Sequence, residues 1–246
     1  MHGKKKSRYL WTKSQRTSTR EKEAGINKIN QVNIVPVIKP NARQAINDKA
    51  NEQRQRIQQD PVATKEEKEA GVAIVDIGGG TTDIAIFKDN IIRHTCVIPY
   101  GGGIITDDIK EGCSIIEKHA EQLKVKFGSA VPDLEKDSTF VTIPGLHGRP
   151  DKEISLKTLA QIINARVEEI LEMVNTELKA YGAFEQKKKL IAGIVLTGGG
   201  SNLKHLRQLA NYMTGFDSRI GFANEYVAND KNQYLKGPEF ATSIGL

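Results

Sequence analysis

The stretch VDIGGGTTDIAIF at residues 75–87 constrains the fold more than any other part of the chain. Three consecutive glycines separate two apolar runs, and each run has the composition of a β-strand. An ordinary tight turn explains one or two glycines, because glycine adopts left-handed backbone conformations without a steric penalty. Three glycines with an aspartate on each side indicate instead a hairpin tip that a bulky anion approaches closely. This stretch therefore predicts a hairpin with an anion-binding loop.

The composition limits the class of protein. With 246 residues, the chain is long enough to bury a substantial core. It contains no run of about 18 apolar residues, and no apolar segment follows its basic start, so neither a membrane-spanning helix nor a signal peptide is expected. Cys96 and Cys113 are the only cysteines. Without a CxxC pair they favour reduced, buried thiols over a zinc site.

Charge is distributed unevenly along the chain. Residues 1–60 contain 14 Lys and Arg against 5 Asp and Glu, whereas residues 61–246 contain 22 against 25. Because the first part offers little apolar area to bury, its composition predicts a basic, disordered extension over residues 1–62. Such a segment could bind nucleic acid or an anionic membrane. Only Tyr9 and Trp11 could stack on bases there, so no nucleic-acid partner is expected.

From residue 72 onward the pattern is that of an α/β domain. Strands are expected at residues 72–77, 84–87 and 91–98, and a glycine loop then opens a short helix within PYGGGIITDDIKEG. Ser114 and Glu117 have the spacing of a capping box, which predicts a helix from there to about Phe127, ended by Gly128.

The second half continues the alternation of helices and strands. Residues 129–153 suggest short strands and turns, and Ser155 is expected to cap a long helix that closes at Gly182. The buried side of this helix is expected to carry Leu156, Leu159, Ile163, Val167, Ile170, Leu171, Val174 and Leu178. A strand at residues 191–197, a glycine loop and a serine-capped helix at residues 202–213 complete the expected elements.

The segment TGGGS at residues 197–201 repeats the order of strand, glycines and helix. Glycines let backbone amides reach a phosphate without interference from Cβ atoms, and a helix N-terminus adds partial positive charge. Neither glycine loop is a Walker A sequence or a GxGxxG fingerprint. One such loop is explained by packing alone, but two in one domain, one of them flanked by aspartates, predict a nucleotide-binding site.

Three ordered motifs carry a family resemblance. IVDIGGGTTDIAIF resembles the second phosphate motif of the actin-like ATPase superfamily, IVLTGGGSNLKHL resembles its adenosine motif, and PEFATSIGL at residues 238–246 resembles its second connecting segment. The stretch GGGIITDDIKEGCSIIEKHAEQLKVKFGSA is most similar to the FtsA family, with MreB more distant. The resemblance covers residues 63–246.

The resemblance implies a fold and a division into domains. The fold class is α/β, an actin-like (ribonuclease H-like) ATPase lobe with a small inserted α+β subdomain. The nucleotide-binding part would comprise residues 63–128 and 185–246, and the small outer subdomain would comprise residues 129–184.

The resemblance also implies ATP and Mg²⁺ as cofactors. Residues 78–82 would wrap the β- and γ-phosphates, and Asp76 would hold Mg²⁺ through water. Glu121 and Lys124, three apart on one helix face, match the pair that contacts ribose and base, although a surface salt bridge would explain them without the motifs. The expected cofactor-binding residues are Gly78, Gly79, Gly80, Thr81, Thr82, Gly102, Glu121, Lys124, Gly198, Gly199, Gly200, Ser201 and Asn202.

The chain also departs from the family pattern. The first phosphate hairpin, an acidic-x-Gly-[Ser/Thr] stretch, is not found before residue 72, and neither is the segment that positions the hydrolytic water. The sequence is therefore expected to encode only the second of the two lobes between which the family binds nucleotide. ATP binding with at best weak hydrolysis is expected, and no catalytic residue is assigned.

For function, the resemblance implies a division scaffold in the cytoplasm, at the inner face of the membrane. FtsA proteins bind ATP, polymerise as actin-like filaments and tether FtsZ to the membrane through a C-terminal helix, which lies beyond residue 246. The FtsZ C-terminal tail is expected on residues 129–184, with Arg166 as the best candidate contact. The alternatives are an MreB-like ATPase and a sugar- or acetate-kinase-type phosphotransferase, whose substrate lobe and catalytic acid are not found.

Overall fold

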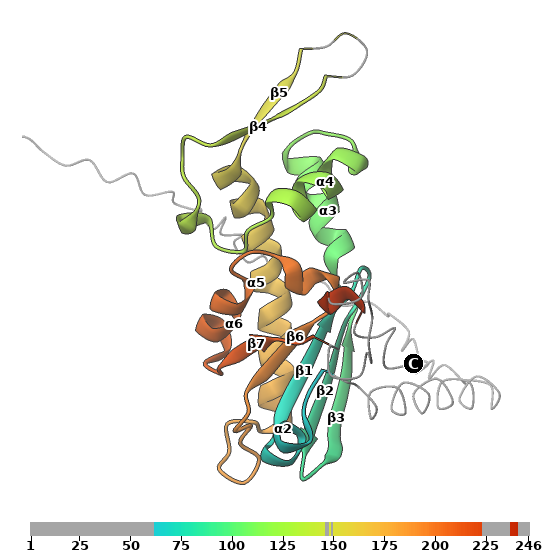
Figure 1. Ribbon diagram of the computed structural model, residues 1–246, viewed down its shortest axis with the longest axis vertical. Helices are drawn as coiled ribbons and strands as arrows, with labels where there is room; N and C mark the ends of the chain where they lie inside the picture. Colours follow the sequence, from blue (N-terminus) through green and yellow to red (C-terminus); the bar gives the residue numbers. More distant parts are fainter. Residues whose placement is uncertain (1–61, 146–147, 149, 223–236, 241–246) are drawn as a thin grey trace, which may run out of the picture. The chain divides into compact units, whose positions relative to one another are not determined.

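The computed structural model describes residues 62–145, 148, 150–222 and 237–240, which are coloured in Figure 1. All of them belong to a compact unit that spans residues 41–246. The expected basic extension at 1–62 lies outside the described residues except for Val62. Residues 241–246 of the expected second connecting segment also lie outside them.

A five-stranded mixed sheet with the order β3-β2-β1-β6-β7 is the centre of the fold. Its first three strands, β1 (Val72–Ile77), β2 (Thr82–Lys88) and β3 (Ile91–Ile98), form an antiparallel meander. The other two, β6 (Ile194–Thr197) and β7 (Ser218–Ile220), continue parallel to β1. The expected strands are confirmed, with β2 two residues longer at its start and β6 three residues shorter at its start than predicted.

The central strand β1 is apolar along nearly its whole length because both faces of the sheet are covered. Val75 and Ile77 belong to one buried core, whereas Val72 and Ile74 belong to a second core on the opposite face. The β2–β3 connection contains Asp89 and Asn90 with φ of 55° and 59°. Both values are left-handed, as a two-residue hairpin turn requires.

The larger core lies between the sheet and the helices. These are α3 (Gly102–Gly112), α4 (Glu117–Phe127), α5 (Leu156–Tyr181) and α6 (Leu206–Thr214). Figure 1 shows α5 running along the sheet towards the hairpin of β4 (Phe140–Ile143) and β5 (Lys152–Ser155). All eight apolar residues predicted on the inner side of α5 are buried, and Gly182 ends the helix in the left-handed conformation, as predicted.

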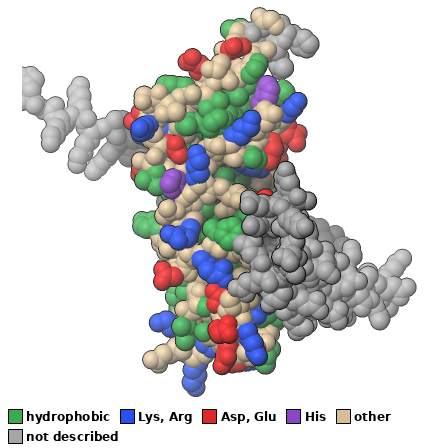
Figure 2. Space-filling model, viewed as in Figure 1, with side chains coloured by type: hydrophobic (Ala, Val, Ile, Leu, Met, Phe, Trp, Pro, Cys, Tyr) green, Lys and Arg blue, Asp and Glu red, His purple; other side chains and the backbone are tan. Residues whose placement is uncertain are grey.

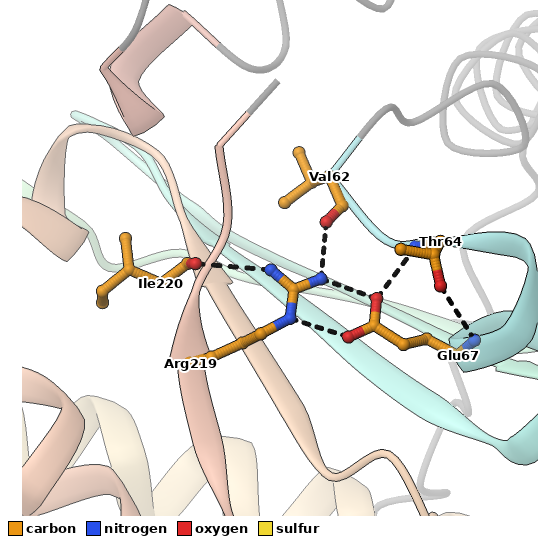
Figure 3. Close-up of polar contacts among 5 residues, drawn as sticks. All are labelled: Val62, Thr64, Glu67, Arg219 and Ile220. Carbon is orange, nitrogen blue, oxygen red and sulfur yellow. Dashed lines mark hydrogen bonds and ion pairs between the residues drawn. The ribbon is translucent and has the colours of Figure 1, made fainter. Parts of the chain in front are cut away.

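The sheet edge at β7 is tied to a short helix that the sequence did not predict, α2 (Lys65–Ala70). Arg219 of β7 donates two hydrogen bonds, of 2.7 and 2.6 Å, to the two carboxylate oxygens of Glu67 and one of 2.8 Å to the carbonyl of Val62 (Figure 3). Thr64 and Glu67 form a capping box at the start of α2. A local cap and a tertiary ion pair therefore share one carboxylate.

Two helix starts differ from the prediction. Ser114 does not cap α4: it adopts a left-handed φ of 47°, and its amide donates to Glu111 at the end of α3. The α4 helix begins after Ile116 without a side-chain cap, so the predicted capping box is wrong. Ser155 does occupy the N-cap position of α5, but its side chain makes no capping hydrogen bond.

The second helix start that differs from the prediction is that of α6, after the second glycine loop. Residues Gly199–Asn202 form a 3₁₀ turn, η2, and α6 begins only at Leu206, after His205 with a left-handed φ of 63°. The predicted serine-capped helix from residue 202 is therefore wrong at its start, because Ser201 bonds back into the loop. Among the described helices, none combines the length and the apolar character needed to cross a bilayer.

Candidate functional site

The first glycine loop, residues 78–81, joins β1 to β2. The amide of Gly78 donates to the carbonyl of Thr81 at 2.9 Å and closes the turn. A Cβ atom at Gly79 or Gly80 would meet nothing within 4 Å. Within the described part of the chain, the amides of these two glycines have no hydrogen-bond acceptor. The tip thus presents bare backbone donors to open space, which is what an anionic ligand requires.

The first turn of α3 holds this loop from the other side. The amide of Gly102 donates to the carbonyl of Gly78 at 2.8 Å, and that of Gly103 donates to Gly79 at 2.6 Å. A Cβ at Gly101 would lie 2.6 Å from the carbonyl oxygen of Gly78, so only glycine permits this approach. The predicted site residue Gly102 therefore positions the loop with its amide.

The two threonines of the motif do different things. Thr81 is exposed and donates its hydroxyl to Asp83 Oδ2 at 3.1 Å. Thr82 is fully buried, and its hydroxyl donates to the carbonyl of Tyr100 at 2.8 Å. Thr82, a predicted phosphate contact, does not line the cavity described below, and its hydroxyl fixes the segment that enters α3.

Asp76 and Asp83 lie directly opposite each other on β1 and β2. Burial and the nearby carboxylate of Asp76 raise the pKa of Asp83, against a hydrogen bond from Thr81 that lowers it. A Cβ at Gly198 would lie 2.2 Å from Asp76 Oδ1, so Asp76 is placed against the second glycine loop.

No cluster of three metal-ligating side chains occurs among the described residues. A hard cation held by Asp76 through water, with phosphate oxygens completing its shell, fits this donor set.

The pair Glu121 and Lys124 lies on one face of α4, as predicted, with Lys124 Nζ 2.7 Å from Glu121 Oε2. Thr106 of α3 donates its hydroxyl to the same oxygen at 2.5 Å. Partial burial acts to raise the pKa of Glu121, but hydrogen bonds from Lys124 and Thr106 outweigh it and hold the pKa below its usual value. The carboxylate is therefore ionised and oriented at neutral pH.

The second glycine loop is fastened to the segment Pro238–Phe240, η4. The amide of Gly198 donates to the carbonyl of Pro238 at 3.2 Å, and Asn202 Nδ2 donates to Glu239 Oε2 at 2.9 Å. Ser201 is buried, and its hydroxyl donates to the carbonyl of Gly198 at 2.7 Å. Ser201 therefore stabilises the loop from inside and does not line the cavity described below.

The two loops and the helices α3 and α4 enclose a cavity of about 340 Å³. It is lined by Gly78, Gly79, Gly102, Ile105, Glu121, Lys124, Val125, Gly199, Gly200, Asn202, Leu203 and Glu239. The predicted site residues that do not line it are Asp76, Gly80, Thr81, Thr82, Gly198 and Ser201. Most of the predicted site is thus brought together.

Four lining residues were not predicted from the sequence. Val125 and Leu203 directly follow Lys124 and Asn202 in the chain, so their neighbourhood in the motifs could have identified them. Glu239 lies in the motif PEFATSIGL, and Ile105 lies three residues after Gly102, so both also stand in stretches that the family resemblance covers. The side chains of Ile105, Val125 and Leu203 make part of the cavity lining apolar. The first glycine loop, by contrast, contributes polar backbone groups.

Arg166, the expected contact for a peptide carboxylate, is already engaged. Its guanidinium donates to both carboxylate oxygens of Asp108, at 2.6 and 3.0 Å, and also pairs with Glu169. It lies over the ring of Tyr100, 5.8 Å from the centroid. This side chain links α5 to α3 and is not on a free solvated face, so an incoming carboxylate would have to displace Asp108.

The sheet order, the paired glycine loops at the ends of β1 and β6, and the helix pair beside them define an actin-like ATPase fold. A solved structure of MreB5 of Spiroplasma citri bound to ADP matches with a TM-score of 0.63 at 20% identity, over 85% of this chain and 65% of that chain. The double helical filament of MamK matches with a TM-score of 0.54 at 14% identity, over 85% and 64% of the two chains. At these identities the likeness concerns the fold alone.

The chain belongs to the FtsA family. The family model described as Cell division protein FtsA matches residues 73–245. The Cell division protein FtsA of Neisseria meningitidis serogroup B is 40% identical over 185 residues, which cover 75% of this chain and 44% of that protein. The chain thus spans less than half the length of this relative. A second model, described as a Domain of Unknown Function (DUF1542), matches residues 38–78.

Proposed function

We propose that the cavity binds ATP with Mg²⁺, as the nucleotide site of an FtsA-type division scaffold. One observation carries this proposal: glycine loops from two parallel neighbouring strands face one cavity, beside the Glu121–Lys124 pair of α4. The MreB5 relative of the same fold is described as bound to ADP, which supports an adenine nucleotide as the ligand.

The cavity, together with Gly80 and Asp76 next to the loops that line it, suits the different parts of the nucleotide. The amides of Gly79 and Gly80 would donate to the phosphates, and Asp76 would hold Mg²⁺ through water. The bound Mg²⁺ supplies positive charge that offsets the charge of the phosphates. The carboxylate of Glu121 would accept hydrogen bonds from ribose hydroxyls, and the apolar side chains of Val125 and Leu203 would pack against the base. Hydrolysis by this chain is expected to be weak.

The proposed partners are those of the family. The C-terminal tail of FtsZ would bind within residues 129–184, further copies would assemble as an actin-like filament, and the protein would act at the inner face of the membrane at the division site. The MamK relative is described as a double helical filament, which supports the assembly. On the face drawn in Figure 2, Lys and Arg are interspersed with Asp and Glu, which does not favour a nucleic-acid partner.

The test is a titration of the full chain with a fluorescent ATP analogue in the presence of Mg²⁺. Gly79→Val should lower the affinity at least tenfold, because a side chain at the loop tip blocks the approach of the phosphates. Asp76→Asn should lower it only when Mg²⁺ is present. Tyr212→Ala, a change at an exposed side chain of α6, is the control and should leave the affinity unchanged. Equal affinities for the wild type and Gly79→Val would refute the site.

A further inference from the structure

Lys124 has used all of its hydrogen-bonding capacity inside the protein. An ammonium group carries three protons. Its Nζ atom lies 2.7 Å from each of three acceptors: the carbonyl of Gly102, the hydroxyl of Thr106 and Oε2 of Glu121. Only 13% of its side chain is exposed. Lys124 therefore has no proton to offer a ligand unless one of these three bonds is broken.

Thr106 completes this arrangement. The residue is 5% exposed, and its hydroxyl accepts from Lys124. The single hydroxyl proton has two acceptors within reach, Glu121 Oε2 at 2.5 Å and the carbonyl of Gly102 at 3.1 Å, and the shorter contact favours Glu121. The contacts of Thr106 and Lys124 with the Glu121 carboxylate both reach Oε2, so these two residues leave Oε1 available to a ligand. Half of the Glu121 side chain remains exposed at the cavity wall.

Gly102 connects this group to the first glycine loop. Its carbonyl accepts from Lys124, and its amide donates to the carbonyl of Gly78. The first turn of α3 thus holds the α4 carboxylate on one side and the loop tip on the other. Three interactions in series, from Glu121 to Lys124, from Lys124 to Gly102 and from Gly102 to Gly78, therefore link the carboxylate to the first glycine loop.

We propose that Thr106 and Lys124 are positioning residues that fix Glu121 in the orientation that reads the ribose hydroxyls. This inference rests on the proposed nucleotide site. A carboxylate that is oriented before the ligand arrives loses little side-chain freedom on binding. Because this carboxylate would bind the ribose hydroxyls, the gain in affinity should appear only with ligands that carry them.

The experiment compares Mg²⁺-ATP with Mg²⁺-2′,3′-dideoxy-ATP, which lacks both hydroxyls, on the full chain. The wild type should prefer ATP. Thr106→Val removes the hydroxyl at nearly constant shape and should weaken ATP about fivefold while leaving dideoxy-ATP unchanged. Thr106→Ser restores the hydroxyl and should restore the preference. Lys124→Met should act like Thr106→Val, and the double variant should be no worse than either single one.

Lys110→Met is the matched control, since Lys110 is a partly exposed lysine of α3 whose ion pair, with Asp107, is a 3.4 Å contact. It should leave both affinities unchanged. If Thr106→Val weakens both nucleotides equally, its role is only structural and the inference is wrong. If the wild type binds both nucleotides equally well, the nucleotide site stands and the ribose-reading role of Glu121 falls. If the wild type binds neither, the proposed function itself is wrong and the positioning role fails with it.

Discussion

The two glycine loops need glycine for different reasons, residue by residue. In the second loop, Gly198 has a φ of 79°, and a Cβ there would lie 2.2 Å from Asp76 Oδ1. A Cβ at Gly200 would lie 2.4 Å from Cγ2 of Ile77. In the first loop, Gly79 and Gly80 have open space around them. Packing thus requires glycine at positions 198 and 200, whereas no contact requires it at positions 79 and 80, in agreement with the proposed approach of a ligand there.

The replacement of glycine by alanine should therefore affect stability differently in the two loops. Gly198→Ala should destabilise the fold by about 1–3 kcal/mol, because a left-handed φ and a close contact with Asp76 both oppose a side chain. Gly79→Ala should change the free energy of unfolding by less than about 0.5 kcal/mol. Urea denaturation of the two variants beside the wild type measures both values. A large loss of stability in Gly79→Ala would mean that the first loop is also fixed by packing.

The elements that the sequence predicted are those whose apolar residues repeat. The α5 helix and the strands β1 to β3 have periods of 3.6 and 2 residues or continuous apolar runs, because they bury side chains against the core. The α2 helix buries none of its six residues and β7 has only three, so neither leaves such a pattern. Both depend on the long-range pair between Arg219 and Glu67, which no local pattern reveals.

Helix caps and part of the site show the same limit. Residues 64–67 and 114–117 both have the S/T-x-x-E spacing, but only the first forms a capping box. The second does not form because the backbone of residues 113–115 still bonds to α3. Likewise, motifs located the glycine loops, the α4 pair and the segment of Glu239, whereas Thr106 reaches Glu121 only through the packing of α3 against α4.

The Arg219–Glu67 pair gives α2 and β7 a pH-dependent link. Partial burial acts to raise the pKa of Glu67, but hydrogen bonds from Arg219 and from the amide of Thr64 outweigh it and lower the pKa. A carboxylate with a lowered pKa in the folded state stabilises the fold above its unfolded-state value, near 4.5, and this stabilisation is lost as the pH falls through the folded-state pKa.

Glu67→Gln should therefore lower the free energy of unfolding at pH 7 by about 1 kcal/mol, a value reduced by solvent screening at this partly exposed pair. The difference from the wild type should shrink as the pH falls below 4.5, where the wild-type carboxyl also becomes neutral. Denaturant titrations across this range measure it. Glu69→Gln, at an exposed position of the same helix, serves as the control and should cause no pH-dependent change. A difference that grew towards low pH would contradict the assignment.

At the scale of the whole molecule, one buried core crosses the boundary expected at residues 129–184. Ile143 and Ile154 of the β4–β5 hairpin belong to the same core cluster as Val75 and Ile86 of the sheet. The α5 helix contributes buried residues to that cluster from Leu156 to Leu178. The division into a nucleotide-binding part and an outer subdomain stays a prediction, but a shared core implies that the two parts stabilise each other.

We therefore expect a single cooperative unfolding transition of this compact unit. Ile154→Ala removes a buried side chain from the hairpin, and Ile86→Ala removes one from the sheet, each at a cost of about 2–4 kcal/mol. Both variants should shift the same transition to lower temperature, with the calorimetric and van't Hoff enthalpies equal. Differential scanning calorimetry measures this, and hydrogen exchange of peptides from residues 72–88 and 140–155 locates the loss of protection. If Ile154→Ala produced a separate early transition confined to residues 140–155, the hairpin would be an independent folding unit, because the sheet would then hold its structure without it.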